Sequence, residues 1–184
     1  MQETIIPLNK MKIFLLFLGS IFMIGSGIVL FLNPETNNLI PSYIISLISV
    51  LCIIFFGIGL IYALVKLFDP QPGLVINEKG IHDNSSFIAA GLIEWNDIDD
   101  ISFLDFGFQK IITVKVKDPA KFIDRATGLK RRLIDINSRN YGSPVQLSTV
   151  ILKIDDSSLF ELIQRYLHNY NETIQPSNFN TPQT

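Results

Sequence analysis

IFLLFLGSIFMIGSGIVLFL, residues 13–32, and YIISLISVLCIIFFGIGLIYALV, residues 43–65, are the two stretches that decide how this chain is organised. Neither stretch contains an Asp, Glu, Lys, Arg or His residue. A helix of about 20 residues rises roughly 30 Å, which is the thickness of the hydrocarbon core of a bilayer. The sequence therefore predicts two transmembrane helices, which form a hairpin within residues 13–67.

The cations that flank these stretches predict which way the hairpin faces. Lys10 and Lys12 precede the first stretch, and Lys66 follows the second. The connecting residues 33–42 contain one Glu and no Lys or Arg. Because loops on the cytoplasmic side are enriched in Lys and Arg, we expect an integral protein of the cytoplasmic (inner) membrane with both termini in the cytoplasm. Residues 1–12 would then form a cytoplasmic N-terminal segment.

Small residues recur along both predicted spans at the spacing of a helix contact. Ser20 and Gly27 are seven residues apart in the first span, and Gly59 and Ala63 are four apart in the second. Gly, Ala and Ser let membrane helices approach closely. The pattern fits packing within the hairpin, and it also fits contact with other chains, so the oligomeric state stays open.

The composition of the remaining chain excludes several classes of function. From Leu67 onward there are 12 Lys or Arg residues against 15 Asp or Glu residues, so the basic field that nucleic-acid binding needs is missing. The only cysteine, Cys52, lies in the second span and cannot form an intramolecular disulfide or a thiolate metal cluster. Neither span contains an Asp, Glu, Lys, Arg or His residue that would mark an ion path. We expect one small domain at residues 73–170.

Short apolar runs between turn residues predict an antiparallel sheet in this domain. Residues 113–117, for example, alternate between apolar and charged side chains, as a half-buried strand does. The expected strands or strand edges are residues 74–76, 80–82, 92–95, 98–103, 113–117 and 145–147. Residues 149–154 fit either a strand or a turn.

Two helices are predicted beside the sheet. The first has one apolar face at a spacing of four and three residues, made of Phe122, Ala126, Leu129, Leu133 and Ile136. The second begins at Ser158, where Glu161 completes a capping box. Its expected buried stripe consists of Leu159, Ile163, Tyr166 and Tyr170. The polar residues 171–184 are expected to form a disordered tail. The fold class is therefore α+β.

Four short sequences give the chain a resemblance to a known family. They are GLVINEKGI at residues 73–81, IEWNDI at 93–98, DP at 118–119 and YGSP at 141–144. With them the chain resembles a family of uncharacterised small bacterial membrane proteins that place two transmembrane helices before a cytoplasmic pleckstrin-homology-like domain. The resemblance implies a bent antiparallel sheet with a C-terminal helix, and it implies no known reaction. Such domains often bind phosphoinositides or peptides, but the first hairpin of the sheet here carries only Lys79, beside Glu78.

The residues that could carry chemistry are better explained by structure. Trp95 is expected to anchor the core. His82 and His168 have no second ligand at metal spacing, and no Gly-rich phosphate loop or nucleophile motif is found. Aspartates that follow Trp95 lack the spacing of a calcium loop, and turn or capping roles suit them better; they are Asp97, Asp99, Asp100 and Asp105. We therefore predict no catalytic residue, no cofactor and no metal.

One charged surface is the candidate site. Four basic residues of the first helix fall on a stripe beside its apolar face: Lys121, Arg125, Arg132 and Arg139. Lys130 and Arg131 lie outside this stripe, and the predicted contacts are Lys121, Arg125, Lys130, Arg131 and Arg132. They would bind anionic lipid headgroups or a protein partner if the domain lies close to the membrane. The alternative is a solvated edge balanced by Asp118, Asp124 and Asp135.

These features predict a membrane-anchored, non-enzymatic interaction module that recruits a protein or lipid partner at the inner face of the membrane. The alternative is a structural subunit of a membrane or envelope complex, assembled through the hairpin.

Overall fold

The structure, a computed structural model, describes residues 2–34, 40–105 and 110–174. The chain divides into two compact units. One unit is the hairpin, Asn9–Pro70, and the other, which we call the domain, combines Met1–Leu8 with Gln71–Thr184. The domain is thus built from both sides of the hairpin sequence.

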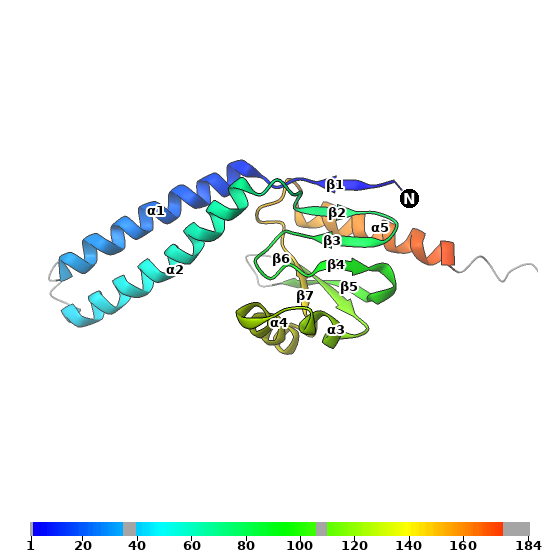
Figure 1. Ribbon diagram of the computed structural model, residues 1–184. Coiled ribbons are helices and arrows are strands. Elements are labelled where there is room, and N and C mark those ends of the chain that lie inside the picture. Colours follow the sequence, from blue (N-terminus) through cyan, green and yellow to red (C-terminus); the bar gives the residue numbers. More distant parts are fainter. Residues whose placement is uncertain (1, 35–39, 106–109, 175–184) are drawn as a thin grey trace, which may run out of the picture. The chain divides into compact units, whose positions relative to one another are not determined.

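The hairpin consists of α1 (Lys10–Leu32) and α2 (Ser42–Phe68), which pack against each other (Figure 1). Both helices are long and apolar enough to cross a membrane, as predicted, and each extends beyond its predicted span. Small residues make their contact, since Ser20, Gly27, Ser49 and Ala63 are buried there. A Cβ atom on Gly27 would lie 3.0 Å from Cγ1 of Ile53. Large apolar side chains such as Phe22 point outward, as they do in helices that face lipid.

A lysine joins the two ends of the hairpin. The Nζ atom of Lys10, in the first turn of α1, donates hydrogen bonds to the carbonyl oxygens of Lys66, Leu67 and Asp69 at 2.9, 3.1 and 2.7 Å. The last carbonyls of a helix have no partner within the helix, and a cation there also complements the helix dipole. Lys10 therefore caps α2 and holds the first turn of α1 beside the last turn of α2.

The domain contains two antiparallel sheets, which confirms the predicted α+β class. The four-stranded sheet has the order β1 (Thr4–Ile6), β2 (Leu74–Ile76), β3 (Gly80–Asp83) and β4 (Gly91–Glu94). The three-stranded sheet has the order β5 (Ile98–Asp105), β6 (Lys110–Val116) and β7 (Val145–Leu147). A short 3-10 turn, η2 (Trp95–Asp97), joins the two sheets, where the sequence had predicted a strand edge at Trp95.

Strand β1 was not predicted. It precedes the hairpin in sequence and pairs with β2, which follows the hairpin, with Thr4 opposite Ile76 and Ile6 opposite Leu74. Two residues after β1, Leu8 forms an isolated antiparallel bridge with Leu152, in another segment of the domain. Ile6 and Leu8 are both buried, so residues 2–8 belong to the domain rather than to a separate N-terminal segment.

The single helix predicted over residues 122–136 is wrong. The structure has two helices, α3 (Pro119–Asp124) and α4 (Gly128–Tyr141). Asp118 caps α3 by accepting hydrogen bonds from the backbone N–H groups of Ala120 and Lys121 at 3.1 and 3.3 Å. Gly128, where α4 begins, has a φ of +56°, so one continuous helix cannot run through this residue. Glycine adopts this positive φ without strain. The break changes which residues face the core.

The helix after the sheets, α5 (Asp156–Ile174), begins two residues before its predicted start. Asp155 caps it, accepting the backbone N–H of Ser158 at 2.9 Å and its hydroxyl at 2.7 Å. These two hydrogen bonds, the N–H first, lower the pKa of the Asp155 carboxyl. The helix continues through residues 171–174, where a disordered tail was predicted; residues 175–184 lie outside the described part of the chain.

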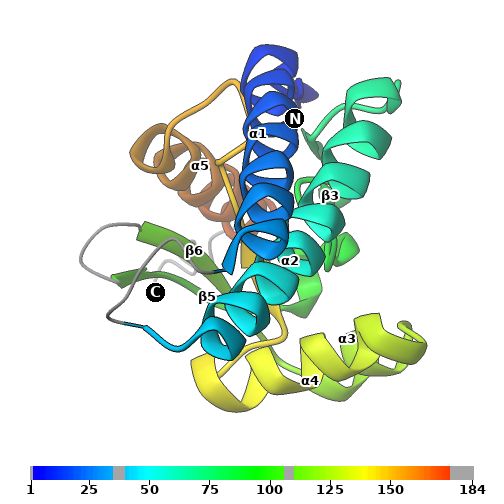
Figure 2. The same ribbon diagram turned by 90° about the vertical axis from the view of Figure 1, so that its left-hand side faces the viewer.

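The core lies between the sheets and α5. The predicted stripe of α5 is confirmed at Leu159, Ile163 and Tyr166, which are buried. Trp95 is only 1% exposed, donates its indole N–H to the carbonyl of Asn77 at 2.8 Å and stacks on Tyr166 with ring centroids 6.1 Å apart. This confirms Trp95 as a core anchor. Helices α3 and α4 lie apart from α5, at the opposite end of the sheets (Figures 1 and 2).

Glycine is required where β3 begins. Gly80 has a φ of +151°, and a Cβ atom built on it would lie 2.0 Å from the carbonyl oxygen of Ile93.

Residues 149–154, which the sequence left open, form a turn that contains the bridge from Leu152 to Leu8.

Candidate functional site

Charge is segregated within the part of the chain that follows the hairpin. The segment 119–141, which holds α3 and α4, has six basic residues and two acidic ones, a net charge of +4. The rest of the chain from Leu67 onward has six basic residues against thirteen acidic ones, a net charge of −7. Helices α3 and α4 are therefore positively charged, although the net charge of the chain from Leu67 onward is negative.

Lys121, the first of the predicted contacts, is used within the fold. Its Nζ atom lies 2.6 and 2.7 Å from the two carboxylate oxygens of Asp97 and 3.8 Å from Glu94. The side chain is only one-third exposed, and the pair ties α3 to the turn η2. We therefore assign Lys121 a structural role.

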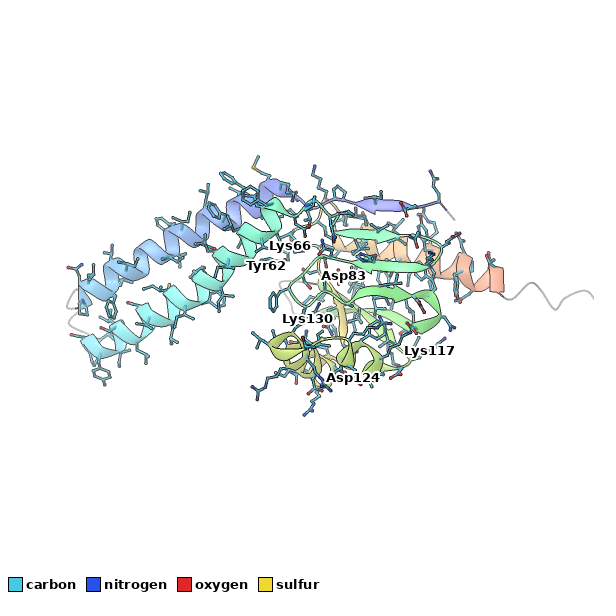
Figure 3. All side chains as sticks on the ribbon, viewed as in Figure 1. Tyr62, Lys66, Asp83, Lys117, Asp124 and Lys130 are labelled. Atoms are coloured by element: carbon cyan, nitrogen blue, oxygen red, sulfur yellow. The ribbon has the colours of Figure 1, made fainter. Side chains whose placement is uncertain are left out.

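Arg125 and Lys130 also hold the helices to the sheet. Arg125 donates from Nη1 to the carbonyl of Leu92 at 2.9 Å, and its guanidinium lies 4.9 Å from the ring centroid of Phe122. Lys130 donates from Nζ to the carbonyl of Ala89 at 2.8 Å, and it points from α4 toward the connection between β3 and β4 (Figure 3). Both cations satisfy backbone carbonyls, so their positions are fixed by the fold.

The three arginines of α4 surround an open groove of about 520 Å³. Its lining residues come from α3 and α4 and are Ile123, Gly128, Arg131, Arg132, Asp135 and Arg139. Arg131 pairs with Asp124 and Arg139 with Asp135, each at 2.8 Å. Both arginines and Asp124 are largely exposed, whereas the side chain of Asp135 is 36% exposed. Within the described residues, Arg132 has no ion pair. The groove thus presents guanidinium groups to solvent, and exposed ion pairs of this kind contribute only about 0–1 kcal/mol.

The outward face of α4 combines these arginines with apolar side chains. At 100° per residue, Leu129, Arg132, Ile136 and Arg139 fall within one arc of the helix, opposite the buried Ile134. The side chain of Leu129 is 64% exposed and that of Ile136 is 45% exposed. The predicted apolar face of this helix is therefore wrong at both positions, because the break at Gly128 rotates α4 and places Ile134 in the core. We call these four residues, with Arg131 at the edge of the groove, the α4 face.

The α4 face keeps two of the five predicted contact residues, Arg131 and Arg132, and adds Arg139. The signal for Arg139 was present in the sequence, since it lies seven residues after Arg132. The spacing predicts that the arginines lie beside the apolar face that contains Leu129 and Ile136. It also predicts that this face is buried, and the exposure of both side chains is the part that the sequence missed.

The other candidate residues have local partners or lie apart. Asp99 pairs with Lys115 at 3.4 Å, and His168 lies 3.2 Å from Glu172. His82 is exposed on β3, and the side chain of Asp105 lies outside the described residues. In the described part of the chain, no three His, Cys, Asp or Glu side chains lie close enough to hold a metal ion.

Comparison of the chain with models of known protein families, with curated proteins and with solved structures found no match.

Proposed function

We propose that this protein is a membrane-anchored, non-enzymatic interaction module. In this proposal the hairpin spans the membrane, and the domain recruits a protein or lipid partner at the inner face. One observation carries the proposal: the domain takes its first strand from before the hairpin and the other strands from after it. Gly73 lies directly beside Leu8, since a Cβ atom on Gly73 would be 3.1 Å from Cδ2 of Leu8. Both ends of the hairpin must then emerge on the same side of the bilayer.

The cations near these ends support the cytoplasmic side. Lys10 and Lys12 lie in the first turn of α1, and Lys66 lies in the last turn of α2. The connecting residues 33–42 carry no Lys or Arg. The positive-inside rule then favours a domain in the cytoplasm. A thiol reagent that cannot cross membranes tests this orientation on a Cys52→Ser, Ser157→Cys chain. Labelling is expected only after the cells are opened, and labelling of intact cells would refute the orientation.

The strand order supports a pleckstrin-homology-like type for the domain. Among the described residues, four antiparallel strands are followed by three, and a helix comes after the last strand. This order is compatible with the bent sheet and C-terminal helix that the family resemblance implies. In this interpretation the hairpin is an insertion between the first two strands, and α3 and α4 are an insertion before the last strand.

A structural subunit of a membrane or envelope complex is the second candidate. Gly19, Gly25 and Gly57 favour it, because no atom lies within 4 Å of the place where a Cβ would be. They leave shallow places on the hairpin surface where another helix could approach closely.

A capture experiment separates the two candidates. It compares the full chain, the hairpin alone (residues 9–70), and a linked domain in which a short Gly-Ser linker joins Leu8 to Gln71. The proposed function predicts that the linked domain retains the partner that the full chain captures from native membranes. Capture by the hairpin alone, with none by the linked domain, would favour the structural subunit and contradict the interaction module.

A further inference from the structure

The α4 face has the composition of a surface that lies on a charged membrane. Helices that lie in the membrane interface place apolar side chains beside Lys or Arg residues. On α4 the exposed side chains of Leu129 and Ile136 alternate with the arginines Arg132 and Arg139. A helix edge that is only solvated has no need of two large exposed apolar side chains in the same arc.

The chain connections keep the domain close to the bilayer that the hairpin spans. Only Asn9 separates Leu8, which is bridged into the domain, from the start of α1. Five residues separate the end of α2 at Phe68 from the start of β2 at Leu74, and they extend over at most about 18 Å. The domain is therefore attached at two neighbouring points, and lipid headgroups lie within its reach.

The uneven distribution of Lys, Arg, Asp and Glu indicates which surface of the domain the headgroups attract. The cytoplasmic leaflet carries anionic lipids and attracts cations by about 1 kcal/mol each near the surface. The segment 119–141 has a net charge of +4 and the rest of the chain from Leu67 a net charge of −7. An anionic leaflet therefore attracts α3 and α4 and repels the remainder of the domain.

The groove beside the α4 face suits lipid phosphates. Arg131, Arg132 and Arg139 line it, and guanidinium groups bind phosphate oxygens in pairs of hydrogen bonds. The ion pairs of Arg131 with Asp124 and of Arg139 with Asp135 are exposed, so they exchange for phosphate contacts at small cost.

We propose that the α4 face docks on anionic lipid headgroups, with lipid phosphates in the groove and with Leu129 and Ile136 against the headgroup and acyl boundary. This inference rests on the membrane anchoring proposed above. It adds to that proposal a ligand class, anionic phospholipid, and the surface that binds it.

The test uses the full chain with a fluorescent probe on the α4 face. Asn140 is exposed within the same arc of α4, so a Cys52→Ser, Asn140→Cys chain carries an environment-sensitive label there without changing the proposed contacts. The chain is reconstituted in vesicles of phosphatidylcholine alone or of phosphatidylcholine with phosphatidylglycerol, and nitroxide-labelled lipid serves as the quencher. A label at Ser157, on α5, is the control position.

Docking predicts strong quenching at Asn140 in the anionic vesicles, weak quenching in the neutral ones, and little at Ser157 in either. At about 1 kcal/mol per cation, the double change Arg132→Glu with Arg139→Glu lowers the docking equilibrium constant by at least about 25-fold. The matched change Lys79→Glu with Arg165→Glu adds the same charge outside the α4 face, at two exposed positions, and leaves the quenching at Asn140 within about two-fold.

Quenching at Asn140 that is absent from the anionic vesicles, or equal in the two lipid mixtures, would overturn the inference. A loss of quenching as large in the Lys79→Glu, Arg165→Glu chain would also overturn it, because the α4 face would then have no special role. Flotation of the same samples on a density gradient measures the anchor separately. A chain that floats without lipid-dependent quenching refutes docking alone, whereas a chain that does not float refutes the anchor on which the proposed function depends.

Discussion

Helices α5 and α4 share an amphipathic sequence pattern, yet the structure uses the two patterns in opposite ways. Helix α5 buries Leu159, Ile163 and Tyr166 in the core, as its spacing predicts. Helix α4 buries Ile134 and exposes Leu129 and Ile136. The difference teaches that apolar spacing shows which residues of a helix share a face, whereas the backbone before the helix decides whether that face meets the core.

The partners of the two helices explain the contrast. Helix α5 packs against β6, and its Tyr166 reaches β1 and the ring of Trp95. Helix α4 contacts α3 and β7, a strand of three residues. A helix that covers a sheet needs a buried stripe, whereas a helix at the end of a sheet can keep an apolar stripe in solvent.

Removal of β1 is expected to have the largest effect, because α5 packs partly on this strand. The linked domain should fold, and the same chain without residues 1–8 should lose at least about 4 kcal/mol of unfolding free energy, or fail to fold. The loss follows from the burial of Ile6 and Leu8, since a buried Leu or Ile contributes about 2–5 kcal/mol. Urea unfolding followed by the fluorescence of Trp95, the only tryptophan, measures it. Equal unfolding midpoints with and without residues 1–8 would show that β1 adds nothing to the domain.

The second prediction compares the apolar residues of the two helices directly. In the linked domain, Ile163→Ala should lower the unfolding free energy by about 2–5 kcal/mol, because it leaves a cavity in the core. Ile136→Ala is the matched change on α4 and should alter it by about 0.5 kcal/mol or less. Similar losses for the two variants would mean that the α4 face is covered rather than open.

A smaller effect is expected from a single hydroxyl of α5. The hydroxyl of Tyr166 donates to the carbonyl of Gln2 and lies 2.7 Å from Oγ1 of Thr4. Tyr166→Phe in the linked domain should therefore cost about 1 kcal/mol, the usual net value of a part-buried hydrogen bond. Tyr170→Phe is the control, since no hydrogen bond of its hydroxyl is found among the described residues. A Tyr166→Phe variant no less stable than Tyr170→Phe would remove the contact between α5 and β1 from the argument.

The smallest effect concerns pH and the cap of α5. The pKa of the Asp155 carboxyl is lowered by the N–H and hydroxyl of Ser158, so the folded state favours the ionised form. The stabilisation is then present above the ordinary carboxyl pKa and is lost as the pH falls through the lowered value in the folded state. In the linked domain, the stability difference from Asp155→Ala should be constant above about pH 5 and should shrink below about pH 4. Asp155→Asn is the control, because its side chain keeps an acceptor that does not titrate. If the stability difference between Asp155→Asn and Asp155→Ala shrank as much at low pH, this account would be contradicted.

The sequence predicted the features that depend on long or repeated patterns. Two charge-free stretches predict the hairpin because lipid-facing helices are apolar on all sides. Most strands and the buried stripe of α5 followed from alternation and helical spacing, and Trp95 from its place before a polar turn. The class α+β is confirmed for these reasons.

The features that the sequence missed depend on contacts between distant residues. Strand β1 has only three residues, Thr4–Ile6, and its partner lies beyond the hairpin, so no local period shows it. The division between α3 and α4 depends on the positive φ of Gly128, and a glycine within an apolar pattern was interpreted only as a weak point of one helix. The groove arose from this division, because it lies where the two helices meet.

The pairing of β1 with β2 also bears on how the protein is made. The ribosome releases β1 before the hairpin and β2 after it, so in the proposed membrane-spanning arrangement β1 has no partner strand until both helices are inserted. A chain that inserted only one span would hold β1 and β2 on opposite faces and could never close its sheet. In the proposed arrangement the domain can therefore be completed only in a chain that has inserted both helices, and a misinserted chain keeps β1 as an unpaired strand.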